Sequence, residues 1–129
     1  MTADDYAGQP APPKPPTGLK KEGRRLWRSV TDAFDLAVHE EQLLAEACRQ
    51  ADRLAELDRA IRQSPLTVFN AKGDEVMNPL RVEARMLAAQ FARTLASLRM
   101  PDVDEDADAA SQRPQRRGGA RGTYGRRTA

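Results

Sequence analysis

Two long stretches of the sequence place apolar residues at every third or fourth position, which is the spacing of one face of an α-helix. They cover residues 39–63 and 79–99. A proline follows each stretch, at Pro65 and Pro101, and stops the helix because its ring cannot continue one. The apolar positions are Leu43, Leu44, Ala47, Ala51, Leu54, Leu57 and Ile61 in the first stretch, and Leu80, Ala84, Leu87, Phe91, Leu95 and Leu98 in the second.

The segment between these helices predicts a small β-hairpin. Residues 66–69 (LTVF) are rich in strand-forming side chains, residues 70–73 (NAKG) are typical of a turn, and residues 75–77 can return as a second strand. Asn78 followed by Pro79 is a strong helix start, since Asn caps the first turn and Pro fits the first helical position. The two long helices are therefore expected to pack antiparallel.

A third, shorter helix is predicted over residues 20–34. Its apolar residues gather on one side, and its basic residues fall within an arc of roughly 140° on the other side at 100° per residue. The expected fold class is all-α with a small β-hairpin: a short N-terminal helix, a long antiparallel helical hairpin and disordered tails. The apolar residues are Leu26, Trp27, Val30, Ala33 and Phe34, and the basic ones are Lys20, Lys21, Arg24, Arg25 and Arg28.

Charge divides the 129 residues into four parts, although the whole chain has a net charge of only +2. Residues 1–18 form a Pro-rich arm that is expected to be disordered, and residues 19–100 are predicted to form a helical domain, whose expected roles in oligomerisation and DNA recognition rest on the residues described below. Residues 101–112 form a linker with five acids and no base, and residues 113–129 form a tail with six arginines and no acid. A domain of about 80 residues buries only roughly 60–65% of its surface, so association with further copies would help to stabilise it.

The first helix and the tail supply the candidate DNA contacts. Lysines at the N-terminal end of a helix oppose its dipole, which points to a use such as phosphate binding. Arginine with flexible glycine and a tyrosine is typical of segments that bind nucleic acid without sequence preference. A solvated face or an acidic protein partner remains open for the helix, and a solubilising role remains open for the tail. The candidates are Lys20, Lys21, Arg24, Arg25 and Arg28 in the helix, and Arg113, Arg116, Arg117, Arg121, Arg126 and Arg127 in the tail.

A face of small residues on the third helix, with two apolar residues of the second, is the candidate oligomer interface. Small side chains allow helices of neighbouring subunits to approach closely, and ordinary core packing is the alternative interpretation. On the outer face of the second helix, opposite charges at helical spacing predict the pairs Glu46–Arg49, Glu56–Arg59 and Asp58–Arg62. The candidate interface residues are Leu57, Ile61, Ala89, Ala92 and Ala96.

The sequence predicts no catalytic residue, no metal site and no cofactor. It has one histidine and one cysteine, and it lacks a glycine-rich phosphate loop and a nucleophile elbow. We therefore predict that the protein is not an enzyme. No apolar run approaches the ~18 residues of a membrane helix, and the N-terminus does not look like a signal peptide, so the expected location is the cytoplasm.

The order of these elements resembles the small terminase subunits of tailed bacteriophages and prophages. The matching stretches are a Pro-rich start, GRRLWRSV at residues 23–30, LLAEACRQADRL at residues 43–54, LTV at residues 66–68 and NPLRVEARMLAAQFARTLASLRMP at residues 78–101. The family usually has Ala after Asn-Pro or His-Pro at the start of the third helix, where this chain has Leu80. The resemblance covers residues 12–101.

The resemblance implies a non-catalytic protein that forms a homo-oligomeric ring and recognises double-stranded viral DNA at the packaging start site. It also implies that the protein regulates a large terminase subunit, which carries the ATPase and the nuclease. The implied location is the cytoplasm of the bacterial host rather than the virion. Two alternatives remain open: a small helical DNA-binding regulator or accessory protein without a packaging role, and a structural adaptor that does not bind DNA.

Overall fold

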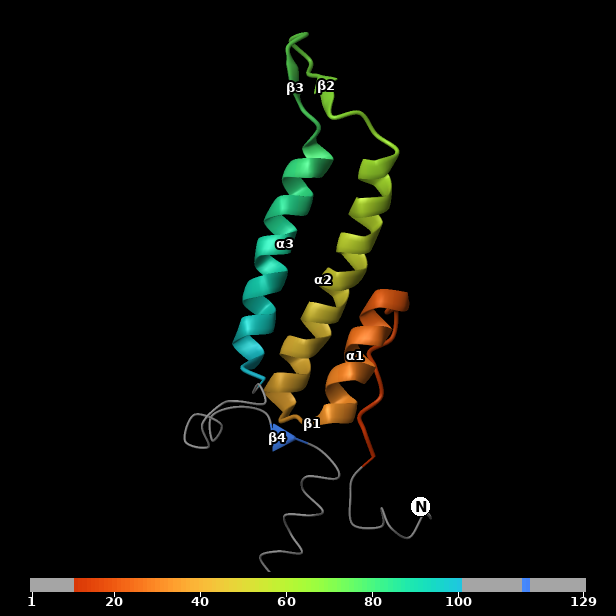
Figure 1. The fold of residues 1–129 in the computed structure, drawn as a ribbon, viewed down its shortest axis with the longest axis vertical. Helices are drawn as coiled ribbons and strands as arrows, with labels where there is room; N and C mark the ends of the chain where they lie inside the picture. The colour runs from red at the N-terminus through yellow and green to blue at the C-terminus, as the bar shows by residue number, and fades with distance from the viewer. Residues whose placement is uncertain (1–10, 101–114, 117–129) are drawn as a thin grey trace, which may run out of the picture.

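The computed structural model of the protein describes residues 11–100 and 115–116. Three helices and a two-stranded antiparallel hairpin make up this part of the chain, which confirms the predicted fold class (Figure 1). The helices are α1 (Lys21–Ala33), α2 (Val38–Arg62) and α3 (Pro79–Leu98), and the hairpin consists of β2 (Thr67–Phe69) and β3 (Glu75–Met77). Each helix begins and ends close to the residue that the sequence predicts.

Local hydrogen bonds explain where the long helices start. At the start of α2, the Glu40 carboxylate accepts a hydrogen bond from the backbone N–H of Ala37 at 2.7 Å. At the start of α3, the Asn78 side chain accepts one from the N–H of Leu80 at 3.0 Å and donates another to the Pro65 carbonyl at 2.9 Å. Asn78 therefore caps α3 and also ties it to the chain that leaves α2.

The hairpin turn is built by Asn70 and Gly73. The Asn70 side chain accepts hydrogen bonds from the N–H groups of Lys72 and Asp74, both at 2.9 Å. Gly73 has a φ of 83°, in the left-handed region that glycine reaches without steric cost. The strands pair in the register Thr67 with Met77, Val68 with Val76 and Phe69 with Glu75, so the turn fixes which side chains the hairpin exposes.

The helices run antiparallel in sequence order, and α1 lies beside only the first half of α2 (Figure 1). We call residues 19–52 and 91–100 the base, where all three helices meet, and residues 53–90 the stalk, where α2 and α3 continue alone to the hairpin. Within residues 11–100, every buried residue except Asn78 lies in the base. The apolar core of the base consists of Leu19, Trp27, Val30, Phe34, Leu44, Ala45, Cys48 and Leu98.

Two further segments are attached to the base. Of the arm that the sequence predicts to be disordered over residues 1–18, residues 11–18 follow a defined course against α1, and the indole N–H of Trp27 donates to the Pro13 carbonyl at 2.9 Å. In addition, β1 (Phe34–Asp35) pairs antiparallel with β4 (Gln115–Arg116), a contact that the sequence pattern does not predict. Residues 1–10, the acidic linker and the rest of the basic tail lie outside the described residues.

Candidate nucleic-acid interface

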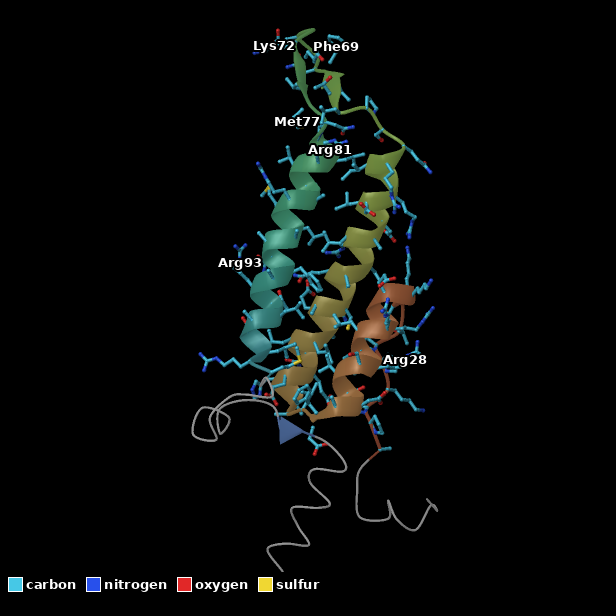
Figure 2. The ribbon with its side chains drawn as sticks, viewed as in Figure 1. Arg28, Phe69, Lys72, Met77, Arg81 and Arg93 are labelled. Atoms are coloured by element: carbon cyan, nitrogen blue, oxygen red, sulfur yellow. The ribbon has the colours of Figure 1, made fainter. Side chains whose placement is uncertain are left out.

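The five basic residues of the first helix are all exposed, on the side of α1 opposite its buried residues. Gly23, Trp27, Val30 and Thr31 form the buried side and pack against α2. Figure 2 shows Arg28 directed away from α2. The amphipathic pattern therefore has the orientation that the sequence predicts, with the cations available to a partner.

Two of the five cations are engaged within the protein. The Lys20 ammonium forms an ion pair with Glu56 of α2, and the Arg24 guanidinium donates to the Leu19 carbonyl at 2.7 Å. The hydrogen bond from Lys20 lowers the pKa of the Glu56 carboxyl below its usual value, because it stabilises the charged form. Lys20 and Arg24 thus help to hold the start of α1 in place.

The remaining three cations form a row. Lys21, Arg25 and Arg28 are spaced by four and three positions, which places them along one face of α1 over about 10 Å at 1.5 Å per residue. None of the three has an ion pair or a side-chain hydrogen bond among the described residues. These three side chains, which we call the α1 row, are the cations of the predicted DNA-binding face of α1 that have no such partner in the described part of the chain.

A carboxylate from α2 explains how α1 tolerates lysines at its N-terminal end. The buried Asp52 accepts hydrogen bonds from the backbone N–H groups of Lys20 and Gly23, both at 2.7 Å. Its negative charge lies at the positive end of the α1 dipole and caps the helix from outside its own sequence. The opposed dipole therefore has a structural compensation, which removes it as an argument for phosphate binding by Lys20.

Gly23 is a position of close approach between α1 and α2. A Cβ atom there would lie 2.8 Å from the Cys48 carbonyl oxygen and would also overlap the Asp52 carboxylate. Sequence reasoning missed Asp52, although a signal was present. Asp52 follows Leu44 and Cys48 at four-residue steps, so its spacing places an acid on the inner face of α2.

One of the three predicted surface pairs is replaced by another. Arg49 pairs with Glu46 at 3.5 Å and Arg62 pairs with Asp58 at 2.7 Å, as expected. Glu56 pairs with Lys20 of α1 instead of Arg59. Arg59 is consequently left without an ion pair or side-chain hydrogen bond among the described residues.

One of the six predicted tail arginines belongs to the described part of the chain. Arg116 lies in β4, where its backbone is opposite Phe34 of β1. The other five predicted contacts, Arg113, Arg117, Arg121, Arg126 and Arg127, lie outside the described residues. The pairing of β4 with β1 brings this point of the tail to the corner between α1 and α2.

The predicted oligomer interface separates into two groups. Leu57 and Ile61 are half-buried, and Leu57 lines a hollow of about 420 Å³ between α2 and α3 together with Leu87. Ala89, Ala92 and Ala96 are exposed on the outer face of α3. Val82 and Met86 continue this exposed face towards the hairpin, because they precede Ala89 by seven and three positions.

The one cysteine and the one histidine of the chain both lie in α2. Burial and the nearby charge of Asp52 raise the pKa of the Cys48 thiol to about 12, so the thiol stays neutral and unreactive near neutral pH. His39 is exposed in the first turn of α2. Within the described part of the chain, no three His, Cys, Asp or Glu side chains are grouped so as to hold a metal ion.

Comparisons with protein-family models, with curated proteins and with solved structures find no match to this chain. Within residues 11–100, each helix is too short or too polar to cross a lipid bilayer.

Proposed function

We propose that this chain is a small terminase subunit of a tailed bacteriophage. In this role it binds double-stranded viral DNA, assembles into a homo-oligomeric ring and regulates a large subunit that carries the ATPase and nuclease activities. It performs no catalysis itself. The resemblance over residues 12–101 suggests the packaging role, and the geometry described above supports a protein that binds a polyanion and further copies of itself.

The α1 row is the observation that carries the DNA-binding part of the proposal. Lys21, Arg25 and Arg28 point to solvent on one face of a helix that is anchored to the core by Trp27 and Asp52. A rigid row of cations suits the phosphate backbone of DNA, because each phosphate contact releases a condensed counterion. Lys20 and Arg24 contribute mainly by holding α1 in position.

The distribution of exposed apolar side chains supports self-assembly. Among residues 11–100, six large apolar side chains are exposed, and five of them belong to the stalk. Exposed apolar area concentrated in one region is typical of an interaction surface. The five are Leu66, Phe69, Met77, Val82 and Met86, and Figure 2 shows Phe69 and Met77 in the hairpin beyond the ends of α2 and α3.

A salt titration of DNA binding tests the α1 row. Changing Lys21, Arg25 and Arg28 together to Gln should weaken binding of a duplex and lower the slope of log K against log salt by about three times 0.9. The matched control changes Arg81, Arg85 and Arg93 of α3 to Gln and removes the same charge. Retained affinity in the first variant, or an equal loss in both, would show that α1 is not the contact.

Mass measurement in solution tests the assembly. We expect a closed oligomer at micromolar concentration, and we expect Phe69→Ser combined with Met86→Ser to shift it towards the monomer. Val38→Ser is the matched control, because Val38 is 72% exposed and Phe69 is 73% exposed, but Val38 lies in the base. A wild-type chain that remains monomeric would reject the ring.

One observation favours the alternative of a small DNA-binding regulator. The base encloses its own core, with Leu44 and Cys48 at 0% exposure, so it can present α1 without any neighbouring subunit. Such a regulator would bind DNA as a monomer or dimer and would leave the ATPase rate of a large terminase subunit unchanged. Measuring that rate with and without the chain distinguishes the two functions.

A further inference from the structure

A hollow lies where α1 begins beside α2, and basic residues of both helices line it. Its volume is about 650 Å³, and we call it the shoulder hollow. Lys20 and Lys21 come from the start of α1, whereas Arg59 and Arg62 come from the last turns of α2. These two arginines are separated from the α1 row by more than thirty residues in sequence.

The cations of the shoulder hollow are available to a ligand to different degrees. Arg59 and Lys21 have no ion pair or side-chain hydrogen bond among the described residues. For Arg59 the reason is that its predicted partner, Glu56, forms an ion pair with Lys20. Arg62 is paired with Asp58, but both side chains are about two-thirds exposed. A pair this exposed contributes little stability, so a phosphate can replace the carboxylate.

Counting Glu56, which pairs with Lys20, the acids around the hollow equal its cations in number, so its capacity for a phosphate rests on the unpaired Arg59 and Lys21 and not on net charge. Lys20, Lys21, Arg59 and Arg62 face three lining acids, which are Glu22, Asp52 and Asp58. Asp52 is already engaged, because its two oxygens accept the N–H groups of Lys20 and Gly23.

The arginines of α2 continue the line of the α1 row. Asp52 fixes the level at which α1 starts beside α2, and α1 runs from there towards the N-terminal end of α2 (Figure 1). Arg59 and Arg62 lie seven and ten residues beyond Asp52, or about 10–15 Å further along the α2 axis. Arg28, Arg25, Lys21, Arg59 and Arg62 therefore follow one another over about 25 Å.

We propose that Arg59 and Arg62 extend the α1 row into one continuous track for a nucleic-acid backbone, with a phosphate group seated in the shoulder hollow. The proposal rests on the DNA-binding function above and adds a second helix to the contact. Cations spread along a line match a polymer that carries one charge per ~1.7 Å of duplex axis. Arginine also binds phosphate through two parallel hydrogen bonds, which favours it at the end of such a track.

The test is a salt titration of duplex binding by the full-length chain with Arg59→Gln and Arg62→Gln combined. We expect affinity at 0.1 M salt to fall by up to about tenfold for each arginine, and the salt slope to fall by about two times 0.9. The matched control, Arg53→Gln with Arg85→Gln, removes the same charge from exposed positions that do not line the shoulder hollow. Far-UV circular dichroism checks that every variant remains helical.

The outcomes separate this proposal from the function on which it rests. If the Arg59/Arg62 variant binds as the wild type does while loss of the α1 row weakens binding, the track ends on α1 and the proposal is wrong. If the control loses as much as the Arg59/Arg62 variant, overall charge rather than the hollow governs binding, and the proposal is again wrong. If the wild-type chain shows no salt-dependent DNA binding, the proposed function fails together with the track.

Discussion

The base and the stalk share two helices, α2 and α3, yet they bury their apolar residues very differently. In the base, α1 packs against α2 as a third helix, and Leu44, Cys48 and Leu98 are 0–1% exposed. In the stalk, the same helices continue as a pair, and the corresponding positions Leu57, Ile61 and Leu87 are only half-buried. Two helices cannot enclose an apolar seam, so the stalk has buried surface to gain from a partner and the base does not.

The difference also separates the two proposed activities. The α1 row lies on the base, where Trp27 and Asp52 hold its helix rigidly. The exposed apolar side chains lie on the stalk. A rigid cationic face suits DNA, whose charge pattern is fixed, and a half-buried helical pair suits packing against copies of itself. The shoulder hollow is the point where the two regions meet.

The largest expected contrast is between the two most different aromatic positions. Trp27→Ala should lower the free energy of unfolding by about 3–5 kcal/mol, because it empties the core of the base and removes the hydrogen bond to Pro13. Phe69→Ala should change monomer stability by less than about 0.5 kcal/mol, because Phe69 is exposed. Urea unfolding followed by circular dichroism at low protein concentration measures both. Equal losses would contradict the division into base and stalk.

Leucine positions give a second test of the same comparison. Leu44→Ala should cost about 2–5 kcal/mol at any concentration, because Leu44 is fully buried within one chain. Leu57→Ala should cost clearly less in the monomer. If copies pack through the stalk, its cost should rise with protein concentration as the assembly forms. Thermal unfolding across a concentration series measures both stability losses. A loss for Leu57→Ala that does not depend on protein concentration would argue against assembly through the stalk.

A substitution at the contact between α1 and α2 should lower the stability of the base by a smaller amount, and the effect should be confined to that region. Gly23→Ala should destabilise the base by about 1–3 kcal/mol, because the new methyl group overlaps the Asp52 carboxylate and the Cys48 carbonyl. Ser29→Ala is a suitable control on the exposed side of α1. Hydrogen exchange should show faster opening of α1 in the Gly23 variant with little change in the stalk. Uniformly faster exchange would mean that the two regions unfold as one unit.

Labelling of Cys48 tests the core of the base without any substitution. Because its pKa is raised to about 12, the thiol should react slowly with a thiol reagent at pH 8 in the native protein and rapidly in urea. The folded pKa lies above the unfolded value near 9.0, so the contribution of this group to stability is complete below pH 9 and is lost as the pH rises towards 12. Fast native labelling would contradict a closed base, and stalk variants should leave the rate unchanged.

The fold was predictable from the sequence because its signals are local. Apolar spacing marks the three helices, Pro65 marks the end of α2, and Asn78-Pro79 marks the start of α3. The sidedness of α1 follows from the same spacing. The resemblance to small terminase subunits rests on these patterns too, and it remains a prediction that the tests above can reject.

The features that sequence reasoning missed join residues far apart in the chain. Asp52 caps a helix whose N-cap residue, Lys20, lies thirty-two residues earlier, and Glu56 pairs with Lys20 instead of its predicted partner Arg59. The indole N–H of Trp27 donates to the Pro13 carbonyl, fourteen residues earlier in the chain. None of these contacts is specified by the spacing within one helix.

The sequence by itself determined the three helices, the hairpin between them and the basic face of α1, because each depends on neighbours within a few positions. The tertiary structure decided how far along α2 the helix α1 reaches, and that position has three consequences. It encloses the core of the base, leaves the stalk half-buried, and selects which cations remain unpaired. These outcomes depend on the close approach at Gly23 and on the buried carboxylate of Asp52, and only the packed helices bring those groups together.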